Sequence, residues 1–180
     1  MKIKNMLYIS MFAAIVAVLG LMPPIPLPFI PVPITLQTMG IMLAGSFLGK
    51  RLGFFSILLV VVVVLLGAPI LSGGRGGISI LAGPTGGFFI VWPLSALFIG
   101  YLTEKFWQNI SISKYILINI LGGIILVYFV GIIHLSYITK MSIPAATVLC
   151  LAFIPGDMIK VVVVSMICQK LKELSPINNN

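Results

Sequence analysis

The segment IPGDMIK, residues 154–160, places two opposite charges inside a long apolar run. Asp157 and Lys160 are three residues apart, so they share one face if the segment is helical. Ionisable side chains cost about 2.5–3.5 kcal/mol each at the centre of a membrane helix, and they face a cavity by default. The pair therefore predicts either a polar binding site or a structural ion pair that pins two helices. Pro155 and Gly156 interrupt the apolar run, so a helix is expected to break or begin there.

A second candidate site is the stretch GGRGGISILAGPTGG, residues 73–87, which holds seven glycines and one arginine, Arg75. Glycine allows close backbone approach and positive φ, and a guanidinium can hold a carboxylate through two parallel hydrogen bonds. The stretch predicts an anion contact at the mouth of a pocket and, from Gly83 to Gly87, a turn leading into a helix. The alternative is that Arg75 reaches lipid phosphates at the membrane surface.

The sequence offers no pattern for catalysis or metal binding. It lacks a hydrolase-like serine motif, paired carboxylates and a cluster of metal ligands. Gly49 and Lys50 resemble the end of a phosphate loop, but Ala44 and Arg51 stand where that motif requires a glycine and a serine or threonine. We therefore expect a binding protein that is not an enzyme, has no cofactor of its own and leaves any ATP hydrolysis to another chain.

Composition decides the class of protein that must position these residues. The chain has 180 residues, of which 60% are hydrophobic and 8% charged, and its mean hydropathy is +1.23. A soluble domain carries roughly 25% charged residues, so this is an integral membrane protein. The run ILLVVVVVLL has none of the alternating polarity that a membrane β-barrel requires. We expect one all-α domain over residues 1–180, with six transmembrane helices at about 6–22, 34–49, 53–71, 84–103, 115–137 and 147–171.

The distribution of basic residues predicts the orientation of these helices. With the N-terminus inside, six crossings place eight Lys and Arg residues on the inner side and two, Arg75 and Lys140, on the outer side. This bias follows the positive-inside rule, so both termini are expected to be cytoplasmic in a multi-pass protein of the cell membrane. Orientation and contact with anionic lipid explain the net charge of +8, and nucleic-acid binding is not expected.

Two features predict how the first helices are joined. Six prolines between Pro23 and Pro33 favour an extended, stiff segment, which serves as a linker against the bundle, as a wall of an outward pocket, or as both. Glycines at a four-residue spacing, Gly45, Gly49 and Gly53, predict close approach between helices.

Three blocks of the sequence together resemble the BioY family, the biotin-binding S components of energy-coupling factor (ECF) vitamin transporters. The blocks are VPITLQTMGIMLAGSFLGKRLG, GGRGGISILAGPTGGFFIVWPL and FIPGDMIK. They occur in order, and the resemblance extends from about residue 6 to residue 172. It implies an S-component-like bundle that binds biotin from the outside with high affinity. It also implies partners, namely a transmembrane coupling protein and two ATPase subunits that supply the energy.

The resemblance implies roles for individual residues. The family's P-G-D-x-x-K block falls on Asp157 and Lys160, which are then expected to bind the ureido ring of biotin. Arg75 is expected to bind the valerate carboxylate. The glycine-rich segment that carries Arg75 and the proline-rich segment are expected to close over the ligand. The family's A-x-x-x-A contact with the coupling protein falls on Ala13 and Ala17, small residues that let helices approach closely.

Two readings other than the binding subunit of an ATP-driven importer stay open. One is a solitary vitamin carrier driven by an ion gradient, and the other is a membrane scaffold whose buried charges only staple helices together. The expected polar contacts to substrate, beyond Asp157, Lys160 and Arg75, are Ser79, Thr85, Gln37 and Thr35.

Overall fold

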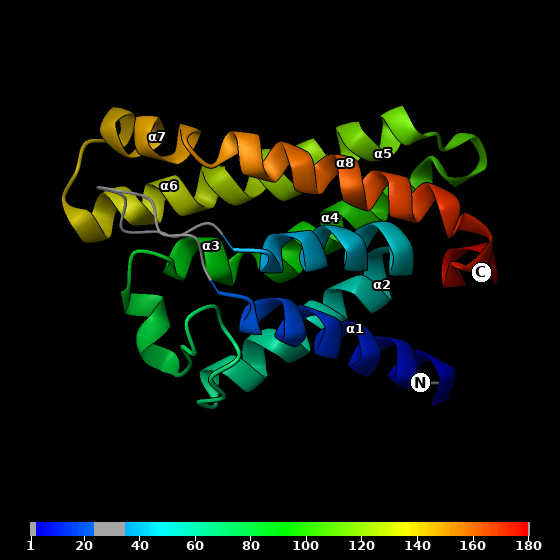
Figure 1. Cartoon of the computed structure of the whole chain (residues 1–180), viewed down its shortest axis with the longest axis horizontal. Coiled ribbons are helices and arrows are strands. Elements are labelled where there is room, and N and C mark those ends of the chain that lie inside the picture. Colours follow the sequence, from blue (N-terminus) through cyan, green and yellow to red (C-terminus); the bar gives the residue numbers. More distant parts are fainter. Residues whose placement is uncertain (1–2, 24–34, 180) are drawn as a thin grey trace.

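The computed structural model describes residues 3–23 and 35–179, and the regular elements of these residues are helices (Figure 1). The longer helices are α1 (Ile3–Leu21), α2 (Gln37–Leu65), α4 (Trp92–Lys105), α6 (Leu126–Thr139) and α8 (Ile154–Lys170). The shorter ones are α3 (Gly86–Ile90), α5 (Ile112–Asn119) and α7 (Ile143–Leu151), with 3-10 turns at Ile78–Ala82, Trp107–Asn109, Lys172–Leu174 and Pro176–Asn179 and a π-helical segment at Ile120–Ile125. The expected all-α membrane protein is confirmed.

Helix α2 lies at the centre of the bundle, packed against α1 and α4. Helix α8 lies beside α2 and α5, while α6 lies beside α3 and α7. Figure 1 shows the two termini at one end of the molecule, and the 66–85 segment and the α6–α7 connection toward the other.

Helix length alone yields fewer candidate spans than the predicted six. Among the described residues, three stretches are long and apolar enough to cross a membrane: α1, α2 and the continuous helix Ile112–Thr139. The pair α7 and α8, bent by 55° at a short break, makes a fourth if it counts as one span.

The difference from six arises at two places along the chain. The predicted segments 34–49 and 53–71 both fall largely within α2, so they count once. The predicted segment 84–103 is divided between α3, with 5 residues, and α4, with 14 residues, and each is too short to be counted by itself. Composition located these apolar segments, but it did not predict where the helices continue or stop.

Helix α2 reverses direction at Gly49. The φ of 82° and ψ of −177° at this residue are non-helical, and glycine adopts such a positive φ without penalty. A Cβ built on Gly53 would lie 3.2 Å from the Cα of Gly45, although a straight helix would keep two such residues about 12 Å apart. The halves of α2 therefore pack against each other, which confirms the close approach predicted from the glycine spacing. Figure 1 shows α2 doubling back.

Glu104 of α4 closes the reversal of α2. Its Oε1 accepts a hydrogen bond from the backbone N–H of Lys50 at 2.8 Å, and its Oε2 pairs with Lys50 Nζ at 2.9 Å. The first contact caps the second half of α2, because the first N–H groups of a helix have no acceptor within it.

Glu104→Ala is expected to lower the free energy of unfolding by about 1 kcal/mol, the usual cost of a lost N-cap. Glu104→Gln keeps an acceptor for the Lys50 N–H and is expected to cost less, since a partly exposed ion pair contributes at most about 1 kcal/mol. Thermal unfolding of the purified protein in detergent measures both variants. An equal loss in the two would contradict the capping role.

Candidate functional site

The α7–α8 junction carries the acidic and basic residues of the IPGDMIK segment into the interior. Pro155 stands in the first turn of α8, where its missing N–H leaves no hydrogen bond unmade. Asp157 and Lys160 then project from the same face of α8, and each is only 6% exposed. The predicted helix break and the predicted shared face are both confirmed.

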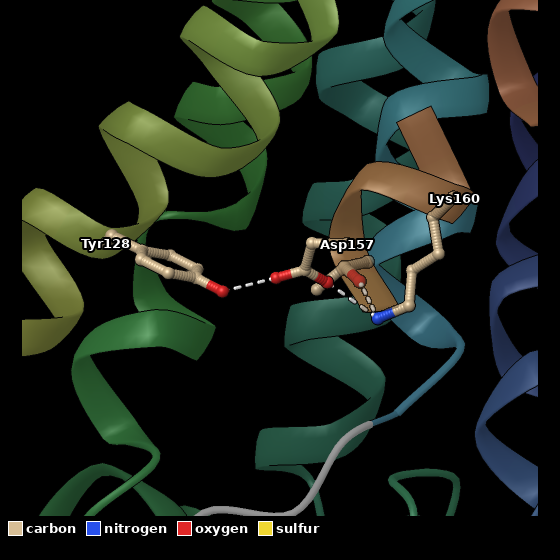
Figure 2. A network of polar contacts seen from close by, with 4 residues as sticks. Tyr128, Asp157 and Lys160 are labelled. Carbon is tan, nitrogen blue, oxygen red and sulfur yellow. Dashed lines mark hydrogen bonds and ion pairs between the residues drawn. The ribbon is translucent and has the colours of Figure 1, made fainter. Parts of the chain in front are cut away.

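Asp157 and Lys160 form the centre of a four-residue polar network. Lys160 Nζ donates to Asp157 Oδ1 at 2.7 Å and to Thr38 Oγ1 of α2 at 3.1 Å. The hydroxyl of Tyr128, on α6, donates to Asp157 Oδ2. Figure 2 shows Tyr128 and Lys160 approaching the carboxylate from opposite sides. The network therefore joins α2, α6 and α8 in the interior of the bundle.

This network keeps hydrogen-bonding capacity for a ligand. An ammonium group has three donors and a carboxylate has about four acceptor positions. Among the described residues, the contacts of Lys160 use two of those donors and the contacts of Asp157 use two of those acceptor positions. A donor and an acceptor thus remain side by side, and this arrangement suits a ligand group with a carbonyl next to an N–H, such as a urea or an amide.

A pocket reaches this network from the surface. The pocket contains about 690 Å³ of space between atoms, and this figure includes solvent at its open mouth. Its lining includes the predicted contacts Gln37, Arg75, Thr85, Asp157, Lys160 and Thr35. Ser79 is not part of the lining, and it lies exposed on the 3-10 turn Ile78–Ala82.

Aromatic side chains, which the sequence did not single out, form much of the pocket wall. They are Phe88, Phe89, Trp92, Tyr128 and Phe153. Phe88 meets Tyr128 edge-to-face with ring centroids 6.2 Å apart, and Phe89 meets Trp92 in the same way at 5.1 Å. One signal was present in the sequence: a tyrosine inside an apolar run needs a partner for its hydroxyl, and Tyr128 stands in such a run.

Arg75 lies on a tight turn at the pocket mouth. Leu71 and Arg75 form an isolated antiparallel bridge, and the turn between them uses positive φ at Gly73 (80°) and Gly74 (68°). Arg75 Nε donates to the Ser72 carbonyl oxygen at 3.1 Å. The terminal nitrogens Nη1 and Nη2 take no part in this bond, and on the exposed guanidinium they suit a carboxylate.

Other predicted features lie away from the pocket or outside the described residues. Ala13 of α1 is 9% exposed and packs into the hydrophobic core of the chain, whereas Ala17 is half-buried. Ala13 thus faces this chain's own core, and a coupling-protein contact through the two alanines stays a prediction. The proline-rich segment, from residue 24 to residue 34, falls outside the described residues.

Comparison with known proteins confirms the resemblance stated above. The model of the BioY family matches residues 1–176. The biotin transporter BioY of Rhizobium etli is 42% identical over 172 residues, which cover 93% of this chain and 92% of that protein. The probable biotin transporter BioY of Bacillus subtilis is 39% identical, covering 96% of this chain and 92% of the relative.

The fold is similar to that of a solved structure. A crystal structure of the S-component for biotin from an ECF-type ABC transporter superposes with a TM-score of 0.92 at 37% sequence identity, covering 95% of this chain and 92% of the other. The family match over residues 1–176 includes the helices that build the pocket and the Asp157–Lys160 network. With a family match over nearly its whole length and relatives about 40% identical, this chain belongs to the BioY family.

Proposed function

We propose that this chain is the substrate-binding S-component of an ECF-type biotin transporter, a multi-pass subunit of the cell membrane that is not itself an enzyme. The observation that carries the proposal is the pocket, which is lined both by the buried Asp157–Lys160 pair and by Arg75. The names of the relatives support biotin as the substrate, and the name of the solved S-component supports the transporter class.

The chemical parts of biotin match the parts of the pocket. Its ureido ring carries N–H donors beside a carbonyl, so Asp157 accepts from an N–H while the remaining donor of Lys160 meets the carbonyl oxygen. Its sulfur-containing ring and aliphatic chain are apolar and suit the aromatic wall. Its valerate carboxylate suits the guanidinium of Arg75. Thr85 and Gln37 lie along the same pocket.

We propose that the single domain crosses the membrane six times, with both termini cytoplasmic. The crossings are α1, the two halves of α2, the α3–α4 pair, the helix from α5 to α6, and the α7–α8 pair. Two observations support this topology. The termini lie at the same end of the molecule (Figure 1), and the reversal at Lys50 and the connection after Lys105 carry basic residues, as cytoplasmic segments do.

The proposed partners are a transmembrane coupling protein and two ATPase subunits. Liposomes that contain this chain with those subunits are expected to accumulate biotin only when ATP is supplied. Uptake by liposomes that contain this chain alone, abolished when the ion gradient is collapsed, would instead favour the solitary carrier.

Calorimetry on the purified protein in detergent tests the choice of substrate. We expect tight binding of one biotin per chain and no binding of thiamine or riboflavin, because neither of these carries a cyclic urea and a carboxylate at its two ends. A folded protein that fails to bind biotin would overturn the proposal.

A further inference from the structure

The side chain of Gln37 is already committed to the protein backbone. It lies in the first turn of α2 and is only 1% exposed. Its Nε2 donates to the carbonyl oxygen of Ile70 at 3.2 Å, and its Oε1 accepts from the backbone N–H of Ser72 at 3.2 Å. The amide therefore hydrogen-bonds to the backbone on both sides of Leu71, where the turn that carries Arg75 begins.

The turn that follows is closed by its own hydrogen bonds. The N–H of Leu71 donates to the Arg75 carbonyl oxygen at 3.0 Å, and the N–H of Gly74 donates back to the Leu71 carbonyl oxygen at 2.9 Å. Arg75 Nε adds its bond to the Ser72 carbonyl oxygen. Since these contacts stay within residues 71–75, they shape the turn without fixing where it stands over the pocket. The amide of Gln37 is an external anchor at the start of this turn, beside the buried side chain of Leu71, while the Gly77 N–H donates to the Val64 carbonyl oxygen after the turn.

Packing holds the anchor in place. A Cβ on Gly20, near the end of α1, would lie 2.1 Å from the Ile70 carbonyl oxygen and 2.5 Å from Gln37 Nε2. The α1 backbone thus presses on the junction between Gln37 and Ile70, and the amide has little room to turn away.

The next residue of α2, Thr38, contacts the charged pair at the opposite end of the pocket. Thr38 accepts from Lys160 Nζ, so adjacent positions of one helical turn contact the Asp157–Lys160 network and the Arg75 turn. We infer that Gln37 is a positioning residue, which sets the place of the Arg75 guanidinium relative to the buried charged pair. It thereby determines how strongly the site selects a ligand with a carboxylate at its far end. This inference rests on the proposed function for the identity of the ligand.

The ratio of affinities for biotin and biotin methyl ester measures this selection, because only biotin offers Arg75 an anion. Gln37→Met keeps the length of the side chain but neither donates to Ile70 nor accepts from Ser72. We expect it to lower the ratio by about tenfold, the scale of a hydrogen bond to a charged group, with little change in affinity for the ester. Arg75→Gln should lower the ratio similarly, and adding Gln37→Met to it should lower the ratio no further.

Ser72→Ala is the matched control. Ser72 takes part through its backbone N–H and C=O, while its hydroxyl is buried without a partner among the described residues. The ratio is expected to stay at the wild-type value in this variant. Should Gln37→Met fail to fold, Gln37→Asn makes the same test, because it keeps the amide but shortens its reach.

Two results would overturn the inference. If Gln37 contacted only the part of the ligand that biotin and its ester share, or only stabilised the fold, both would lose affinity equally and the ratio would not change. The second test needs no ligand: hydrogen exchange at residues 70–75 should speed up in Gln37→Met but not in Ser72→Ala, and unchanged exchange would refute the anchor. If the wild type fails to bind biotin, the proposed function fails, and this exchange measurement still decides whether Gln37 anchors the turn.

Discussion

Replacing Asp157 by alanine is expected to weaken biotin binding by about 30-fold to several thousand-fold. The substitution removes an acceptor for the ureido N–H and leaves Lys160 buried without its counter-ion, a loss that typically costs about 2–5 kcal/mol, with tenfold per 1.4 kcal/mol. The pair is well shielded, since its side chains are 8% and 7% exposed. Calorimetry with biotin measures the change, and an unchanged affinity would exclude Asp157 from the site.

A loss of binding alone does not separate a ligand contact from a structural staple, because the unpaired Lys160 also destabilises the fold. The double variant Asp157→Asn with Lys160→Met removes both charges, and replacing a buried ion pair by neutral groups is often neutral for stability. We expect it to unfold near the wild-type temperature and still fail to bind biotin. If the pair only stapled helices, the double variant would recover both stability and binding.

The sequence could locate this pair because charge inside an apolar run is rare and must be satisfied. Pro155 marked the start of α8, and the i, i+3 spacing placed the two residues on one face. The contacts of Asp157 and Lys160 with Tyr128 and Thr38 come from other helices, and no local pattern links these positions. The charged pair was therefore predictable, whereas its partners required the tertiary structure.

The aromatic wall could not be predicted, for a reason particular to membrane proteins. Phe89 and Phe98 belong to the same predicted span, yet Phe89 is 1% exposed and lines the pocket while Phe98 is 39% exposed on the outside. In water, polar neighbours would mark the outer face of the helix, but lipid accepts the same apolar residues as a protein core. The pattern of hydrophobic residues therefore does not distinguish the side of a helix that faces the pocket from the side that faces lipid.

Gln37 shows a similar limit for polar residues. It was among the polar contacts to substrate expected from the sequence, and the pocket lining does include it. Its partners, the backbone at Ile70 and Ser72, follow more than thirty residues later in a turn built from positive-φ glycines. A sequence predicts that such an amide must be satisfied, but it does not reveal whether the ligand or the backbone satisfies it.

A large loss of stability is expected for Gly100→Ala, at the crossing of α4 and the α2 reversal. A Cβ on Gly100 would lie 2.4 Å from both the carbonyl carbon of Gly49 and the backbone nitrogen of Lys50. Both are main-chain atoms, so no rotamer change can relieve the clash. One helical turn further along α4, Glu104 caps the same nitrogen, so separating the helices also breaks that cap. We expect the free energy of unfolding to fall by about 3 kcal/mol, at the upper end for overpacking.

Two other glycines serve as matched controls for this prediction, because they separate lack of space from backbone strain. Gly83 has a φ of −91° and its added Cβ would meet the nearest atom at an ordinary 3.4 Å, so Gly83→Ala should leave the unfolding temperature unchanged. Gly73 has open space but a φ of +80°, so Gly73→Ala should cost about 1–2 kcal/mol. Thermal unfolding in detergent should therefore give Gly100→Ala the lowest unfolding temperature, followed by Gly73→Ala and then Gly83→Ala.

Because Gly100 lies two turns of α4 away from Trp92 in the pocket wall, the fraction of protein able to bind biotin should fall in Gly100→Ala while the Kd of that fraction stays the same. A wild-type unfolding temperature in Gly100→Ala would mean that α4 does not cross the reversal of α2 at this contact.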